Sequence, residues 1–146
     1  MYTPYILLAD DDPDDRDSLI HSFVQQNPGV RVVSFGDGGE LLSFLENCPD
    51  DELPVLILMD YKMPYWTATD ILERLAANPR YANIPKLVWS TSGRAEYVDS
   101  CVERGASQYF TKPNSLPELA NIVERVTRVF RTRLSVSPLQ GSVPAV

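Results

Sequence analysis

Short apolar segments alternate with helix-like segments five times along this 146-residue chain, and no other feature limits its fold as strongly. Each apolar segment has the length of one strand, and each segment after it repeats apolar residues at helical spacing. Strands joined by helices through short links form parallel sheets covered on both faces. We therefore predict an α/β fold, a doubly wound five-stranded parallel sheet in the flavodoxin-like order 2-1-3-4-5, with strands at residues 5–9, 30–35, 54–60, 85–90 and 107–111.

The predicted helices follow these strands, and their ends carry local signals. Asp12 precedes Pro13, which is the order expected of a helix N-cap and a first helical position. Gly105 suits a left-handed stop after the fourth helix. We place the helices after Asp12, at residues 37–47, 67–77 and 94–104, and from about Ser115 onward. The folded domain is predicted to span residues 1–132, and residues 133–146, rich in Ser, Pro and Val without periodicity, are predicted to form a disordered tail.

The composition is that of a soluble globular protein, with 44% apolar and 23% charged residues. No apolar stretch approaches the roughly 20 residues that span a bilayer, and the N-terminus has no basic region, so we expect a cytoplasmic protein without a membrane segment. A net charge of −7 argues against nucleic-acid binding. Cys48 and Cys101 are expected to be free thiols. The late basic residues are interpreted as a solvated helix face: Arg125, Arg128, Arg131 and Arg133.

The acids that end two of the strands predict a metal site. Asp10 and Asp11 follow the first strand and Asp60 closes the third, at the switch point where doubly wound sheets bind ligands. Three converging carboxylates repel one another and need a cation. Oxygen ligands suit a hard ion, so we predict Mg²⁺, with Asp11 in direct contact and Asp10 in contact directly or through water. The acids of the next helix are predicted to be solvated and only to make the mouth more negative: Asp14, Asp15 and Asp17.

Lys112 follows the fifth predicted strand and completes this set of strand-end residues. Its ammonium is a compact charge on a flexible stem, which we expect to pair with Asp60 or with a phosphoryl group on that aspartate. Pro113 is a candidate for a cis peptide bond that fixes the direction of the lysine. Ser90 ends the fourth strand, and we expect its hydroxyl to donate to a phosphoryl oxygen.

Four segments together resemble the receiver domain of bacterial two-component response regulators of the chemotaxis, single-domain type. The resemblance covers about residues 4–132 and is carried by residues 7–12, 58–64, 88–90 and 105–113. It implies a stand-alone, non-enzymatic signalling domain that acts through a downstream protein target, because no DNA-binding or catalytic domain follows residue 132.

The same resemblance implies a role for each strand-end residue. Asp60 would accept a phosphoryl group from a sensor histidine kinase or a phosphotransfer protein. The implied Mg²⁺ ligands are Asp10, Asp11, Asp60 and the backbone carbonyl of Lys62. Ser90 and Lys112 would bind the phosphoryl group, and Tyr109 would rotate with the switch, although a buried Tyr109 with a satisfied hydroxyl is an equal reading. The output surface would be the fourth helix, fifth strand and fifth helix, which also offers a face for a homodimer.

Three positions depart from the family pattern. Ala68 stands where the family usually has Gly, with the bulky Trp66 just before it, and Asn114 stands where Phe often follows Lys-Pro. The first departure affects the loop over the site, and the second affects the packing of the last helix. Lys62 lies beside the expected phosphoryl group, where we expect it to alter attack by water.

Two other functions remain open at this point. The first is a Mg²⁺-dependent phosphatase with an aspartate nucleophile; such an enzyme usually has a second Asp two residues after the nucleophile, where this chain has Lys62. The second is a receiver-like module that is never phosphorylated and acts only through protein contacts. This module is disfavoured by the intact acid pair together with Asp60 and Lys112, although less strongly than the phosphatase is disfavoured by Lys62.

Overall fold

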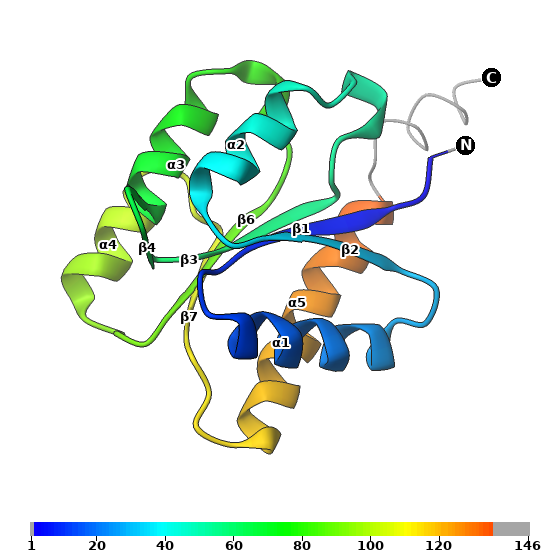
Figure 1. Ribbon diagram of the computed structural model, residues 1–146, viewed down its shortest axis with the longest axis vertical. Coiled ribbons are helices and arrows are strands. Elements are labelled where there is room, and N and C mark those ends of the chain that lie inside the picture. The colour runs from blue at the N-terminus through cyan, green and yellow to red at the C-terminus, as the bar shows by residue number, and fades with distance from the viewer. Residues whose placement is uncertain (1, 136–146) are drawn as a thin grey trace.

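The computed structural model describes residues 2–135 and contains the predicted parallel sheet (Figure 1). Its strand order is β2-β1-β3-β6-β7, which is 2-1-3-4-5 when these five strands are counted along the chain. The sheet prediction is therefore confirmed. The strands are β1 (Tyr5–Ala9), β2 (Arg31–Phe35), β3 (Leu56–Asp60), β6 (Lys86–Ser90) and β7 (Gln108–Thr111).

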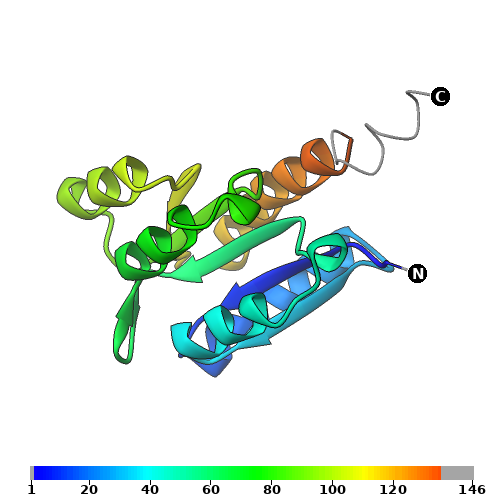
Figure 2. The ribbon, with the colours of Figure 1, turned by 90° about the horizontal axis from the view of Figure 1, so that it is seen from above.

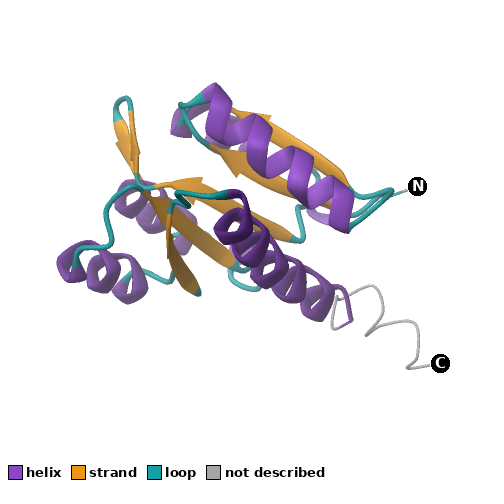
Figure 3. Ribbon diagram, turned by 90° about the horizontal axis from the view of Figure 1, so that it is seen from below, coloured by secondary structure: helices purple, strands orange, loops and turns teal. Residues whose placement is uncertain are grey.

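Helices cover both faces of the sheet, as Figures 2 and 3 show. α1 and α5 lie on one face, where Phe23 of α1 meets Phe130 of α5 edge to face at 5.6 Å between ring centres. α2, α3 and α4 pack on the other face. The helices are α1 (Pro13–Gln26), α2 (Gly38–Glu46), α3 (Ala68–Ala76), α4 (Ala95–Glu103) and α5 (Leu116–Ser135), with 3₁₀ turns η1 (Asp50–Glu52) and η2 (Pro79–Tyr81).

The central strands are buried on both faces, which explains their unbroken apolar sequences. In β1, Ile6 and Leu8 pack toward α1 and α5, whereas Leu7 packs toward α2 and α3. β3 divides in the same way, and every residue from Leu56 to Asp60 is buried. Strands fixed from both sides present the residues at their carboxyl ends in a defined place.

The predicted helix signals act as expected. Asp12 caps α1 by accepting hydrogen bonds from the backbone N–H groups of Asp14 and Asp15, and Gly105 after α4 has a φ of +105°. α5 continues to Ser135, so residues 133–135 belong to this helix and not to the tail predicted to begin at 133. The remainder of the predicted tail lies outside the described residues.

A hairpin that the sequence did not predict follows the end of β3. β4 (Lys62–Met63) and β5 (Trp66–Thr67) pair antiparallel and project from the carboxyl edge of the sheet (Figure 2). Tyr65 at its tip is 99% exposed and has a φ of +65°, a conformation that side chains disfavour and that glycine usually occupies after Pro in such a turn. Trp66 anchors the hairpin, because its ring lies under Arg74 and against the start of α2.

The hairpin tip leads to a stability prediction. Tyr65→Gly removes the strain of a positive φ, and it costs little packing because the ring is exposed. We therefore expect a gain of roughly 0.5 kcal/mol in the free energy of unfolding. Tyr65→Ala loses the same ring but keeps the strained Cβ, and should give no gain. Urea denaturation of the two variants and the parent chain measures this, and equal stability of the Gly and Ala variants would contradict it.

Candidate functional site

The three predicted acids meet at the carboxyl ends of β1 and β3. One carboxylate oxygen from each of Asp10, Asp11 and Asp60 lies within 4.8 Å of the others. The strand register causes this, since Ala9 pairs with Met59 and the next residue of each strand is an aspartate. Asp10 and Asp60 are buried, whereas Asp11 is exposed. The arrangement combines two buried acids with one that faces solvent.

Three hydrogen bonds to neighbouring residues hold Asp10 in place. Its Oδ1 accepts a hydrogen bond from the N–H of Asp12 at 2.8 Å, and its carbonyl accepts one from Nη1 of Arg16 at 2.6 Å. Its own N–H donates to the carbonyl of Phe35 at 3.1 Å. Its Oδ2 is paired with the Lys112 Nζ ammonium at 2.9 Å. Both carboxylate oxygens of this buried acid are therefore held by a donor or a cation.

Lys112 reaches into the acid cluster from the end of β7. Its backbone N–H donates to the carbonyl of Ser90 at 2.7 Å, which fixes the root of the side chain. Its Nζ lies 3.3 Å from Oδ2 of Asp60, so the predicted pair is present, and 5.2 Å from the centre of the Trp89 ring. The described peptide bonds are all trans, so the expected cis bond at Pro113 was wrong.

Asp15 also belongs to the site, which the sequence prediction missed. Lys112 Nζ donates to its Oδ2 at 2.8 Å, and the Asp15 side chain is 37% exposed. The prediction that Asp15 is only a solvated acid was therefore wrong. A signal was available: Asp15 lies in the first turn of the helix that begins directly after the Asp10-Asp11 strand end, so it stays close to that edge of the sheet.

Ser90 and Tyr109 are both linked to the loop after β6. Ser90 is buried, and its Oγ accepts a hydrogen bond from the backbone N–H of Ser92 at 3.1 Å. The hydroxyl of Tyr109, which is half-buried, donates to the carbonyl of the same Ser92 at 2.6 Å. The two residues expected to act in the switch therefore contact one loop residue from two sides.

The remaining sequence candidates lie at the edge of the site. Lys62 begins β4 and its side chain is exposed. Ala68 is fully buried as the first residue of α3, and Trp66 packs toward α2 and α3. The N–H of Asn114 donates to Oε1 of Glu118 at 3.3 Å, so this residue helps to start α5. Their effects on phosphoryl chemistry stay predictions.

Burial and mutual repulsion disturb the ionisation of the site. Burial, and then the charge of Asp10, raise the pKa of Asp60 to about 7. Burial also raises the pKa of Asp10, while the Asp12 N–H and Lys112 oppose this. For Lys112, burial alone lowers the pKa, but its hydrogen bonds with Asp15 and Asp10 raise it above the ordinary lysine value. One ammonium does not neutralise this many carboxylates.

The donor set fits a hard divalent cation. Asp10, Asp11 and Asp60 offer only oxygen atoms, one from each lies within 4.8 Å of the others, and burial together with the charge of Asp10 raises the pKa of Asp60. Mg²⁺ prefers this chemistry, with one or two carboxylates and additional oxygen ligands. The residues present therefore suit the metal that the sequence predicted.

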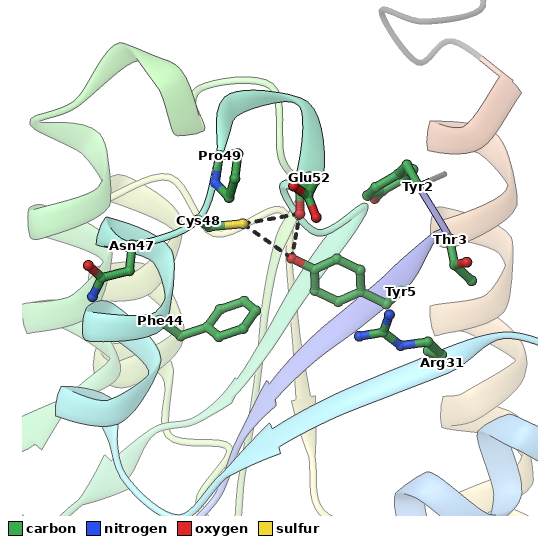
Figure 4. Close-up of a pocket in the computed structure, with 9 residues that line it drawn as sticks. All are labelled: Tyr2, Thr3, Tyr5, Arg31, Phe44, Asn47, Cys48, Pro49 and Glu52. Carbon is green, nitrogen blue, oxygen red and sulfur yellow. Dashed lines mark hydrogen bonds between the residues drawn. The ribbon is translucent and has the colours of Figure 1, made fainter.

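A hollow of about 320 Å³ lies away from this site, at the other ends of β1 and β2 (Figure 4). Two of its polar groups are already paired, because the Tyr5 hydroxyl and the Cys48 thiol both donate to the carbonyl of Glu52, at 2.7 and 3.1 Å. Cys48 and Cys101 are free, as predicted. The residues that line the hollow are Tyr2, Thr3, Tyr5, Arg31, Phe44, Asn47, Cys48, Pro49 and Glu52. It lacks the acid cluster of the first site.

Comparison with known families agrees with this geometry. The family model of the response regulator receiver domain matches residues 6–124. The chain belongs to this family. The receiver is 29% identical over 126 residues to the two-component response regulator ORR12 of Oryza sativa subsp. japonica. This match covers 86% of this chain and 100% of that protein. The receiver is also 31% identical to an uncharacterised 14.6 kDa protein of Leptolyngbya boryana, covering 86% of this chain and 91% of the other.

Solved structures share the receiver fold. The Mn²⁺-bound form of response regulator Rcp1 matches with a TM-score of 0.74 and 25% identity, over 84% of this chain and 91% of that one. The phosphorylated cyanobacterial phytochrome response regulator RcpA matches with a TM-score of 0.79 and 24% identity, over 88% and 94%. The family and fold expected from the sequence are therefore confirmed. Within residues 2–135, no helix has the length and apolar character needed to cross a membrane.

The ionisation of Asp60 gives a stability prediction for the metal-free receiver. A carboxyl group with a pKa of about 7 when folded, against 3.8 ordinarily, holds its proton more tightly in the folded state. The free energy of unfolding therefore falls as the pH rises from about 4 to about 7. Asp60→Asn removes this loss, so its stabilisation should be roughly 2 kcal/mol larger at pH 8 than at pH 5.

Urea denaturation in the presence of a chelator measures this difference. Asp17→Asn is the matched control, because it removes an exposed acid from the next helix and should show no such dependence on pH. The same stabilisation of Asp60→Asn at both pH values would contradict the assignment.

Proposed function

We propose that this receiver accepts a phosphoryl group on Asp60, in a Mg²⁺-dependent reaction, from the phosphohistidine of a sensor kinase or phosphotransfer protein. The observation that carries the proposal is the convergence of three carboxylates and the Lys112 ammonium at the carboxyl edge of the sheet. Function lies in such a site and not in the fold, which serves many activities.

Each residue has a physical role in the transfer. A carboxylate oxygen of Asp60 forms the new bond to phosphorus while the bond from phosphorus to the donor imidazole nitrogen breaks. Lys112, already 3.3 Å from Asp60, is placed to neutralise charge on the transferring oxygens. A Mg²⁺ ion held by Asp10, Asp11, Asp60 and the Lys62 carbonyl would supply further positive charge there. Positioning and electrostatics supply the catalysis, and the domain turns over no external substrate.

The contacts of Ser92 suggest how phosphorylation changes the surface. In the structure, Oγ of Ser90 accepts a hydrogen bond from the N–H of Ser92 at 3.1 Å. If the Ser90 hydroxyl donates to a phosphoryl oxygen, Oγ turns away from this N–H. Ser92 then moves, and Tyr109 loses the carbonyl to which its hydroxyl donates. The loop between β6 and α4 is thereby coupled to the face formed by α4, β7 and α5. The added charge of the phosphoryl group rearranges the loop, and the loop changes this face.

This α4-β7-α5 face is the proposed contact for a downstream protein target or for a second copy of the receiver. Its arginines already have partners within the chain, which disfavours a nucleic-acid surface. Arg125 lies 4.9 Å from the centre of the Phe110 ring, and Arg128 pairs with Glu124. The net charge of −7 points the same way, and we propose that the receiver works in the cytoplasm.

A transfer experiment tests the proposal against its alternatives. Incubation with acetyl phosphate and Mg²⁺ should add the mass of one phosphoryl group, and Asp60→Asn should abolish the addition because no nucleophile remains. Asp17→Asn, an exposed acid outside the cluster, should react like the parent chain. Turnover of a phosphomonoester would favour the phosphatase, and no mass increase would favour a module that acts only by contact.

Lys62 should set the lifetime of the acyl phosphate. Lys62 follows Asp60 by two residues, and we expect its ammonium to pair with phosphoryl oxygens and hinder attack by water. Lys62→Asn should shorten the lifetime about two- to fivefold, the effect of losing one exposed ion pair. Lys62→Arg keeps the charge and should keep the lifetime. Loss of the mass increase after removal of the donor measures both, and an unchanged lifetime in Lys62→Asn would contradict this role.

A further inference from the structure

We infer that Asp15 is a positioning residue that holds the Lys112 ammonium when Mg²⁺ takes Asp10 and Asp60. This inference rests on the proposed function, since it concerns the metal that the site would bind. Asp15 is not one of the three clustered acids that offer ligand atoms to a metal. Its contact with the site passes through the lysine.

The distances show that Lys112 is shared between two sides of the site. On the inner side its Nζ lies 2.9 Å from Asp10 and 3.3 Å from Asp60, the two buried acids. On the outer side, in the first turn of α1, it lies 2.8 Å from Asp15. An ammonium has three donors, and the carboxylates of Asp15, Asp10 and Asp60 are all within reach of it. The outer contact is the shortest of the three.

A metal ion and the ammonium compete for the same carboxylates. Asp10 and Asp60 are two of the three acids that would hold the metal, and two cations close together repel each other. The Lys112 side chain is only 9% exposed, so it does not reach bulk water easily. A buried charge left without a partner is costly. Asp15 removes this cost, because Lys112 keeps one carboxylate when it gives up the other two.

Asp15 differs in this respect from its neighbours on α1. Asp14 and Asp17 carry the same charge near the same mouth, but both are exposed. If charge alone attracted the metal, these acids would contribute like Asp15. If the contact with Lys112 matters, only Asp15 affects the affinity strongly, and only while the lysine is present. This difference makes the inference testable with matched substitutions.

Calorimetric titration with MgCl₂ alone, at one pH, tests the inference. Asp15→Asn should weaken Mg²⁺ binding about fivefold, whereas Asp14→Asn, with the same loss of charge, should weaken it by less than about twofold. Asp15→Glu keeps a carboxylate and should recover most of the affinity. In a Lys112→Met background no ammonium needs a partner, so Asp15→Asn should cost no more there than Asp14→Asn does.

Two results would overturn the role of Asp15 while leaving the proposed function intact. One is an equal loss of affinity from Asp15→Asn with Lys112 present or replaced, because Asp15 would then act on the metal itself. The other is an equal loss from Asp15→Asn and Asp14→Asn, which needs no Lys112 background and decides the matter even if that variant does not fold. Failure of the parent chain to bind Mg²⁺ would contradict both this role and the metal part of the proposed function.

Discussion

A lysine ammonium set among carboxylates holds the carboxyl edge of this sheet together. Asp10 and Asp60 are buried, and two buried like charges at the ends of adjacent strands would be unfavourable without a cation between them. Lys112 provides that cation and spans to Asp15 on α1. The ends of β1 and β3 and the start of α1 therefore all contact the ammonium that follows β7. The excess of negative charge that remains is what fits the site to a divalent metal.

The same edge couples the site to the surface of the receiver. The backbone of Lys112 donates to the carbonyl of Ser90, so the lysine and the serine hydroxyl are placed by one hydrogen bond between β6 and β7. Ser92, two residues on, is held by both Ser90 and Tyr109. In the proposed function, a change of charge at Asp60 would reach α4 and β7 through these few contacts. The loops above the buried strands would carry the change.

Several features of the site depend on how far long side chains extend toward other segments, and strand and helix patterns in the sequence do not predict this. The prediction placed Asp10, Asp11, Asp60 and Lys112 together correctly, because each ends a parallel strand. It assigned Asp15 to solvent, because nothing in the pattern says that a lysine from the far end of the chain extends to α1. The hairpin of β4 and β5 escaped prediction for a similar reason: Trp66 is fixed by Arg74 and α2, contacts that are distant in sequence or made only in the fold.

The sequence by itself determined the order of strands and helices, the burial of the central strands, the caps at Asp12 and Gly105, and the acids and lysine at the strand ends. These are consequences of local periodicity and of backbone preferences, which need no distant partner. Tertiary structure alone decided which carboxylate completes the contacts of Lys112. This depends on packing between segments far apart in the chain, where small differences in distance select one partner from several of equal charge.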